Sequence, residues 1–403
     1  MGTGNIKVKI EKFATVMRRI SFLLFVMLMA TGVAFAQNWV GTWATAVENT
    51  GKKDMPQQMQ LTGNSVRQIV HVSLGGDVLR LQLSNEFGSD AVEIKSVYVA
   101  DALEGKEIDK KTAQYLKFDG KPGVTIAPGK TAFSDALKYK LRPLQLLSIT
   151  VCYGQSPEKV TSHRGSRTRS YIMQGESKPK ADFVVGETLE HWYNIAAIDV
   201  VAPEGTPCIA ILGNSITDGR GSTTDKQDRW PDMLSNALGG KVGVLNLGIG
   251  GNCVLEGGIS QPAVERFDRD IMSQRGLTAV IIFEGINDIG GSKNAERTAR
   301  RLINAYKELI GKARAKNLKV YGGTITQMLG SSHWSYYHEA ARQEVNEWIR
   351  TGKAYDAVID FDRVTLNPDN PQQLRPDLQS DKLHPNARGY QLMGEAAAQI
   401  VGK

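Results

Sequence analysis

The sequence predicts a chain of the α/β class in which a β-sandwich precedes a domain built on a parallel β-sheet. Three observations predict it. Apolar and polar residues alternate with period two through residues 39–200, a short linker follows at 202–207, and from residue 208 continuous apolar runs alternate with amphipathic segments. The chain has 403 residues, 41% hydrophobic and 23% charged, so it is long enough for two globular domains of ordinary composition.

Residues 1–36 have the pattern of a secretory signal peptide. Arg18 and Arg19 precede the apolar run "ISFLLFVMLMATGVAFA", which ends with small residues at Ala34 and Ala36. The strongly apolar part is shorter than the ~20 residues that span a bilayer, which disfavours a permanent anchor. We therefore expect cleavage after Ala36, a secreted or periplasmic protein, and no stable membrane insertion afterwards.

The net charge argues against a nucleic-acid partner. The formal net charge is +7, but the five basic residues and one glutamate within residues 1–36 account for +4 and leave +3 for the remainder. A charge of that size is too small to indicate binding to a polyanion, so no nucleic-acid partner is expected.

Residues 37–203 are assigned to the β-sandwich, which we expect to be jelly-roll-like. The segments "VRQIVHVSLGGDVLRLQLSNEFG" (66–88) and "VEIKSVYVA" (92–100) alternate apolar and polar residues, with glycine-containing turns between the runs. Such short strands with frequent turns are typical of two packed antiparallel sheets. The linker "APEGTP" then closes this domain.

Residues 204–403 are assigned to the second domain, a parallel sheet covered by helices on both faces. Its apolar runs are nearly continuous, as strands buried on both faces require, and a segment of helical periodicity such as 294–316 follows. The runs are "CIAILG", "VGVLNLG", "LTAVIIFEG", "LKVYGGTIT" and "AVIDF". Ligands of such sheets bind beyond the carboxyl ends of the strands. Four loops are therefore expected at one place: 213–222, 248–256, 284–292 and 326–338.

Ser215 follows the first of these strands, within "ILGNSITDGRGS" (211–222). A serine hydroxyl is a weak nucleophile unless a base lies within reach and hydrogen-bond donors await the oxyanion. A serine in a turn is the ordinary alternative. The partners of Ser215 therefore decide its role.

The candidate base and its orienting carboxylate lie in "SDKLHPNARGY" (380–390). Asp381 precedes His384 by three residues, Pro385 favours an extended backbone, and a helical pattern follows. This spacing allows the carboxylate to accept from one imidazole nitrogen while the other nitrogen faces Ser215. Alone, each would be an ordinary loop or surface residue.

Two loops offer donors for an oxyanion, and none of the cofactor motifs tested is present. In "NLGIGGN" (246–252) glycines let backbone amides approach a ligand, and in "EGIND" (284–288) Asn287 offers a side-chain amide. A dinucleotide fingerprint fails because Cys253 stands where its last glycine belongs. There is no phosphate-binding P-loop, no H-E-x-x-H and no clustered Cys/His spacing, so no metal or organic cofactor is expected.

Four blocks in order, "GNSITDG", "GIGGN", "GIND" and "DKLHPN", resemble those of the SGNH (GDSL-type) hydrolase superfamily over residues 205–403. No G-x-S-x-G surrounds the serine, which argues against an α/β-hydrolase. The resemblance implies a flavodoxin-like three-layer domain. It also implies roles: Ser215 as nucleophile, His384 as base, Asp381 as its orienter, and Gly251 and Asn287 as oxyanion donors beside the Ser215 amide.

The chain departs from the family pattern at one position. Asn214 stands where the family usually has an aspartate. In the family that residue mainly supports the loop, so an amide can substitute for it by hydrogen bonding. The early segment "WVGTWATA" (39–46) also resembles the region that precedes the catalytic domain in some secreted bacterial SGNH esterases. We expect a structural role for this region, with glycan binding as the alternative.

Aromatic residues near the predicted site leave the substrate open. Loop 326–338 carries Trp334, Tyr336 and Tyr337, and Trp230 follows the serine loop. Such rings stack on sugars, but they also suit half-buried packing. Four charged residues near predicted helix starts are expected to be helix caps or ion pairs outside the site: Asp218, Arg229, Arg266 and Asp268.

The sequence thus predicts a secreted serine esterase that removes short acyl groups, above all acetyl, from carbohydrate. An acylated carbohydrate or another small ester is the expected partner, and the oligomeric state stays open. A lipase or broad carboxylesterase is the alternative among enzymes. A carbohydrate-binding protein with a vestigial esterase site is the alternative of another class.

Overall fold

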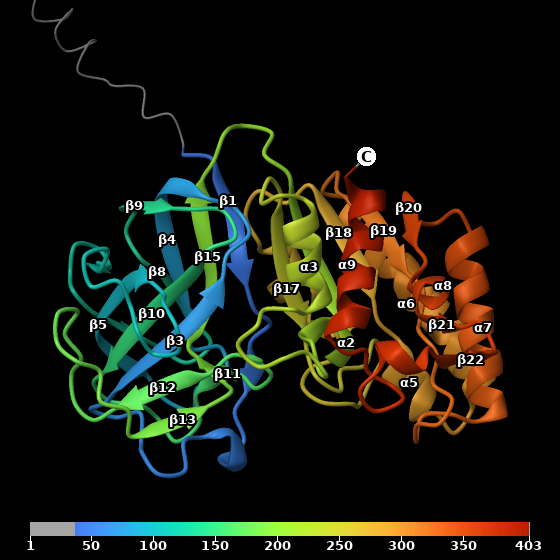
Figure 1. Ribbon diagram of the computed structural model, residues 1–403, viewed down its shortest axis with the longest axis horizontal. Helices are drawn as coiled ribbons and strands as arrows, with labels where there is room; N and C mark the ends of the chain where they lie inside the picture. The colour runs from blue at the N-terminus through green and yellow to red at the C-terminus, as the bar shows by residue number, and fades with distance from the viewer. Residues whose placement is uncertain (1–36, 403) are drawn as a thin grey trace, which may run out of the picture. The chain divides into compact units, whose positions relative to one another are not determined.

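This computed structural model describes residues 37–402 (Figure 1). Antiparallel sheets make up the first half of this part of the chain. In β4 (Gly76–Ser84) the side chains of Leu79, Leu81 and Leu83 are buried, and the residues between them are partly exposed. This alternation gives each sheet one apolar face, and those faces form a shared core. The predicted β-rich first half with antiparallel sheets is confirmed.

Three antiparallel sheets contain the strands of this region. The first has the order β1 (Trp39–Ala44), β15 (Ile195–Val201), β4 and β8 (Thr131–Phe133), with β9 (Leu137–Leu141) also paired to β4. The second has the order β13 (Glu187–Leu189), β12 (Ser170–Met173), β3 (Ser65–His71), β10 (Leu146–Tyr153), β5 (Val92–Asp101) and β6 (Gln114–Tyr115), with β7 (Val124–Ile126) also paired to β5. The third joins β14 (Trp192–Tyr193), β11 (Thr161–His163) and β2 (Glu48–Asn49), and the 3-10 helix η1 (Lys52–Asp54) follows β2.

A five-stranded parallel sheet forms the centre of the second half. Its order is β17 (Gly243–Gly248), β16 (Cys208–Gly213), β18 (Ala279–Phe283), β19 (Lys319–Gly323) and β20 (Ala357–Ile359). The first strand of this sheet, β16, therefore lies between the second, β17, and the third, β18, which is the flavodoxin-like order predicted. From β16 the chain adds β17 on one side and then reverses to add the later strands on the other. The register pairs the last residue of β16, Gly213, with Gly248 and Phe283. The loops that leave these three strands consequently start side by side.

Helices cover both faces of the parallel sheet (Figure 1). The helix α3 packs against α9, and α6 packs against α7. With right-handed crossovers, the reversal at β16 puts the first pair on one face and the second pair on the other. The helices are α2 (Ser215–Asp218), α3 (Trp230–Ala237), α4 (Ala263–Phe267), the π-helix η2 (Asp268–Met272), α5 (Ile286–Gly290), α6 (Ala295–Arg314), α7 (Tyr336–Thr351), α8 (Phe361–Thr365), the 3-10 helix η3 (Pro376–Leu378) and α9 (Ala387–Val401); a hairpin of β21 (Leu366–Asn367) and β22 (Asn370–Leu374) precedes η3.

The antiparallel and parallel parts share one core. The change from antiparallel to parallel strands falls between β15 and β16, as the linker prediction requires. One cluster of buried apolar side chains nevertheless continues through both parts, and from Trp39 onward the chain forms one compact unit. The assignment of 37–203 and 204–403 to separate domains stays a prediction.

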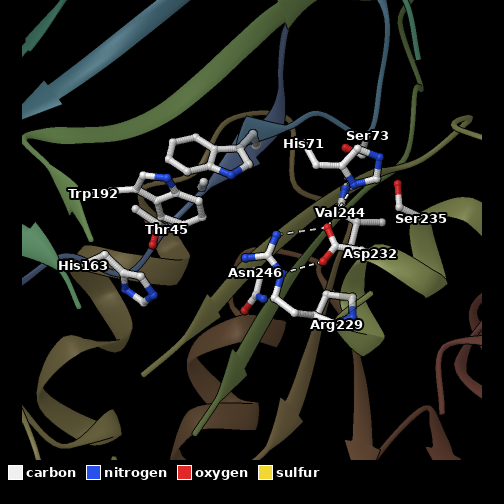
Figure 2. Close-up of a pocket in the computed structure, with 13 residues that line it drawn as sticks. Thr45, His71, Ser73, His163, Trp192, Arg229, Asp232, Ser235, Val244 and Asn246 are labelled. Carbon is white, nitrogen blue, oxygen red and sulfur yellow. Dashed lines mark hydrogen bonds and ion pairs between the residues drawn. The ribbon is translucent and has the colours of Figure 1, made fainter. Parts of the chain in front are cut away.

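A buried hydrogen bond between His71 and Asp232 links the β-rich region to α3 (Figure 2). Asp232 accepts from Arg229 Nε at 2.5 Å and lies 3.0 Å from His71 Nδ1 on β3. Burial raises the pKa of Asp232, but the charge of Arg229 and the hydrogen bond with His71 outweigh it and hold that pKa well below its usual range. The cavity beside these residues has only about 20 Å³, room for one water rather than for a substrate.

Membrane insertion and secretion were both predictions about the start of the chain. Across residues 37–402, no helix combines the length and the apolar character that crossing a membrane requires. The expected signal peptide and its cleavage site after Ala36 lie outside the described residues.

Candidate active site

Ser215 is the first residue of α2, immediately beyond the carboxyl end of β16. The turn from strand to helix is tight, because a Cβ on Gly213 would lie 2.1 Å from Thr217 Oγ1. Asn214 caps the helix, since its Oδ1 accepts from the Ile216 backbone N–H at 3.0 Å. The turn therefore delivers the Ser215 hydroxyl to the rim of the sheet.

The structure brings Ser215, His384 and Asp381 into one hydrogen-bonded chain. Ser215 Oγ lies 2.8 Å from His384 Nε2, and His384 Nδ1 lies 2.9 Å from Asp381 Oδ2. Asp381 Oδ1 also accepts from the backbone N–H groups of His384, at 2.9 Å, and Leu383, at 3.2 Å. The carboxylate thus fixes both the loop and the orientation of the imidazole, as the spacing predicts.

The environment favours a neutral His384 beside an ionised Asp381. Burial lowers the pKa of His384, the hydrogen bond and charge of Asp381 oppose that shift, and the charges of Arg220 and Arg167 reinforce it. For Asp381, burial raises the pKa, but hydrogen bonds from His384 and Leu383 bring it below its usual range. A neutral imidazole with an oriented carboxylate is the state that can accept a proton from a serine.

Gly251 and Asn287 line the same cleft as Ser215. The backbone of Gly251 has φ +72, and a Cβ there would lie 2.8 Å from the Ile259 side chain, so a glycine is required. Asn287 Nδ2 donates to the Asn252 carbonyl at 2.8 Å, which orients the amide and leaves its second N–H free. His333 Nε2 lies 3.2 Å from Asn287 Oδ1 and holds the other side of this amide.

The side chain of Asn214 is held by the buried carboxyl group of Glu284. Its Nδ2 donates to Glu284 Oε2 at 3.1 Å, and Arg266 Nη2 lies 3.5 Å from the other oxygen of Glu284. Burial raises the pKa of Glu284 to about 8, although the charge of Arg266 opposes the shift. An aspartate at position 214 would set a second acid beside this one, whereas the asparagine supplies a donor. Arg266 forms ion pairs, as expected.

The cleft around Ser215 has a volume of about 290 Å³. Each of the four loops predicted to meet here contributes at least one lining residue. The lining consists of Glu48, Arg164, Gly165, Arg167, Ser215, Asp218, Arg220, Gly250, Gly251, Ile259, Asn287, His333, Leu383 and His384. Four of these residues, Glu48 to Arg167, come from the β-rich region, and sequence reasoning missed them.

Asp218 joins the β-rich wall to the serine loop. Its Oδ1 lies 2.8 Å from His163 Nε2, and its Oδ2 accepts from Arg167 Nη2 at 2.5 Å. Burial raises the pKa of Asp218, but the charges of Arg167 and His163 outweigh it and lower that pKa. The predicted ion-pair role of Asp218 is therefore correct, while its position at the cleft was not expected. A Cβ on Gly165 would lie 2.3 Å from this carboxylate, so the wall sits directly against it.

The predicted aromatic residues take different places. Trp230 is fully buried against Phe361, with ring centroids 5.1 Å apart, so it belongs to the core and not to the site. Tyr336 and Tyr337 are 77% and 79% exposed, and neither lines the cleft. Loop 326–338 contributes His333 instead, one of the two histidines that the sequence places in this loop.

Comparison with known proteins gives one family and several similar folds. Residues 211–392 match the model of the GDSL-like lipase/acylhydrolase family. No curated protein matches the chain.

Among solved structures, a member of the lipolytic protein G-D-S-L family from Veillonella parvula DSM 2008 is 23% identical, with a TM-score of 0.39, over 49% of this chain and 99% of that one. A carbohydrate acetylesterase family member from Sinorhizobium meliloti is 15% identical, with a TM-score of 0.38, over 48% and 97%. A GDSL-like lipase from Bacteroides thetaiotaomicron VPI-5482 is 16% identical, with a TM-score of 0.37, over 49% and 88%.

Proposed function

We propose that this chain, a carboxylic ester hydrolase whose residues 211–392 form a domain of the GDSL-like lipase/acylhydrolase family, removes short acyl groups, above all acetyl, from carbohydrate. The observation that carries the proposal is the hydrogen-bonded chain Ser215–His384–Asp381, which opens onto a cleft that also contains Gly251 and Asn287. We also propose that it acts outside the cytoplasm, after cleavage behind Ala36.

The mechanism follows from the positions of these groups. Ser215 Oγ attacks the ester carbonyl while His384 Nε2 accepts its proton, and Asp381 stabilises the resulting imidazolium. The oxyanion is bound by the amides of Ser215 and Gly251, which donate to no other described residue, and by the free N–H of Asn287. His384 then gives its proton to the leaving sugar oxygen, which departs as a hydroxyl group. It next activates water, which attacks the acyl-serine and releases the acid.

The size and lining of the cleft favour a short acyl group on a polar alcohol. The cleft at Ser215 itself has about 290 Å³. Its lining contains two apolar side chains, Ile259 and Leu383, and three cationic ones, Arg164, Arg167 and Arg220. A lipase needs a larger apolar surface around its serine to seat a long chain.

The test of the proposal is a comparison of acyl lengths. The purified protein should hydrolyse 4-nitrophenyl acetate at least about tenfold faster, in kcat/KM, than 4-nitrophenyl octanoate, because the cleft offers an octanoyl chain only the side chains of Ile259 and Leu383 for apolar contact. It should also release acetate from acetylated polysaccharide. A preference for octanoate would support the lipase alternative, and no hydrolysis of either ester would support the carbohydrate-binding alternative.

The acid limb of the pH profile should lie below pH 6.5. Catalysis needs neutral His384, so activity falls as the pH drops through its pKa, which burial shifts below the ordinary value of 6.5. The measurement is kcat/KM for 4-nitrophenyl acetate from about pH 4 to about pH 8. A midpoint at or above 6.5 would contradict the lowered pKa of His384, and a profile that stays flat to pH 4 would contradict its role as the base.

A further inference from the structure

The cleft around Ser215 continues into a second groove. The second groove has a volume of about 700 Å³ and shares three lining residues with the cleft, namely Gly251, Ile259 and Asn287. Two of them, Gly251 and Asn287, are the proposed oxyanion donors. The two hollows therefore adjoin at the reaction centre, and together they offer far more room than one acylated sugar needs.

Three arginines line the first hollow, namely Arg164, Arg167 and Arg220. Glu48 binds Arg164 and Asp218 binds Arg167, but these two carboxylates are almost completely buried, with 2% and 1% of their side chains exposed. The side chains of Arg164 and Arg167 are 23% and 26% exposed. The buried carboxylates thus hold the two guanidinium groups in place, and this wall exposes the arginine side chains to the cleft rather than the carboxylates.

Arg220 completes this wall from the serine loop. Its side chain is 62% exposed, and its ion pair is the loose one of 3.6 Å between its Nε and Asp381 Oδ2. Besides burial, the charges of Arg220 and Arg167 lower the pKa of His384, so both guanidinium groups lie within electrostatic reach of the reaction centre. An anion beside the scissile ester would meet them.

The second groove also has basic side chains, which come from α6 and from the residues just before it. It is lined by Lys293, Arg297 and Arg301, of which Arg301 is paired with Glu256 at 2.6 Å. Lys293 and Arg297 are exposed and form no ion pair with any residue in the described part of the chain. Glu256 and Asp288 line the groove as well, and the charge of Arg297 acts on Glu256. Three basic side chains against two acidic ones leave an excess of positive charge in the groove for an anionic ligand.

We infer that these two basic arms bind an acidic polysaccharide, a chain of sugars that carry carboxylates, and present one of its acyl esters to Ser215. Guanidinium groups pair with carboxylates in a planar fork of two hydrogen bonds, which neutral sugars cannot provide. A polymer threaded through both hollows would place charged units on each side of the scissile ester. This inference rests on the proposed function and specifies its substrate.

The first experiment compares two forms of one polymer. O-acetylated polygalacturonate with free carboxyl groups should release acetate with about tenfold higher kcat/KM than the same polymer after methyl esterification of its carboxyl groups. The preference should shrink in about 0.5 M NaCl, where exposed charges are screened. Equal rates on the two forms would overturn the inference and leave the esterase proposal intact.

The second experiment assigns the preference to the two arms. Arg297→Gln and Lys293→Gln should each lower the preference about two- to fivefold, whereas Arg300→Gln is the matched control. Arg300 lies on the same helix, paired with Glu296, and does not line the groove. In the other arm Arg220→Gln should lower the preference and Arg220→Lys should retain it. A preference unchanged in all of these variants would overturn the assignment.

Binding provides a readout that does not depend on turnover. The Ser215→Ala protein should bind unacetylated polygalacturonate more tightly than its methyl ester, with a dissociation constant that rises with salt. Equal binding of both forms would overturn the inference even if the enzyme hydrolyses acetate esters. Conversely, selective binding together with no hydrolysis of 4-nitrophenyl acetate by the unmodified protein would contradict only the proposed function.

Discussion

Replacement of Ser215 by alanine should lower the hydrolysis of 4-nitrophenyl acetate by about four orders of magnitude or more. The substitution removes the Oγ atom that lies 2.8 Å from His384 Nε2, and no other hydroxyl lines the cleft. His384 would then have only water to activate. The measurement is the initial rate of 4-nitrophenyl acetate hydrolysis by the Ser215→Ala protein, purified so that contaminating esterases do not contribute to the rate.

The fold should survive this change, which makes the result interpretable. The lost hydrogen bond contributes about 1 kcal/mol to the free energy of unfolding, so the melting temperature should move by only a few degrees. Ser222→Ala is a suitable control, because Ser222 lies in the same loop and its hydroxyl is buried without a partner in the described structure. If the Ser215→Ala protein kept its activity, the assignment of the nucleophile would be wrong.

Replacement of Asn287 by alanine should lower kcat by about a hundredfold or more, with a much smaller effect on KM. The side-chain N–H that is not bound to Asn252 is proposed to donate to the oxyanion, and this donor acts mainly in the transition state. Steady-state kinetics with 4-nitrophenyl acetate separates the two constants.

His333→Ala is the matched comparison for this prediction. It removes the group 3.2 Å from Asn287 Oδ1 and leaves the amide donor in place. Its effect on kcat should therefore be well below that of Asn287→Ala. An unchanged kcat in Asn287→Ala would remove this residue from the oxyanion hole, and equal losses in both variants would show that the loss reflects a disturbed loop.

The catalytic half could be predicted from sequence because its signals are local. Continuous apolar runs predicted the strands, and the run at 208–213 coincides with β16. The carboxyl ends of parallel strands lie on one edge of the sheet, so Ser215 and the loops that follow the neighbouring strands had to meet there. His384 is 169 residues from Ser215 in the chain. It could still be predicted, because Asp381 lies three residues before it and a helical pattern follows.

The β-rich wall could not be predicted in this way. Arg164 and Arg167 reach the cleft because β11 pairs with β2 and β14, strands that are far from it in sequence, and such pairing leaves no local trace. The net charge also could not predict the arginines of this wall. A remainder of +3 does not show that the carboxylates are buried behind the arginines while the guanidinium groups face the cleft.

The buried carboxylate of Asp218 has a consequence for how such enzymes diversify. Asp218 stands three residues after the serine, yet its partners His163 and Arg167 belong to the other half of the chain. Substitutions that change which substrates bind can therefore occur in a wall that carries none of the reacting atoms. If the catalytic half were joined to an unrelated β-rich region, Asp218 would lose the contacts with His163 and Arg167 and would remain as a buried carboxylate without its partners.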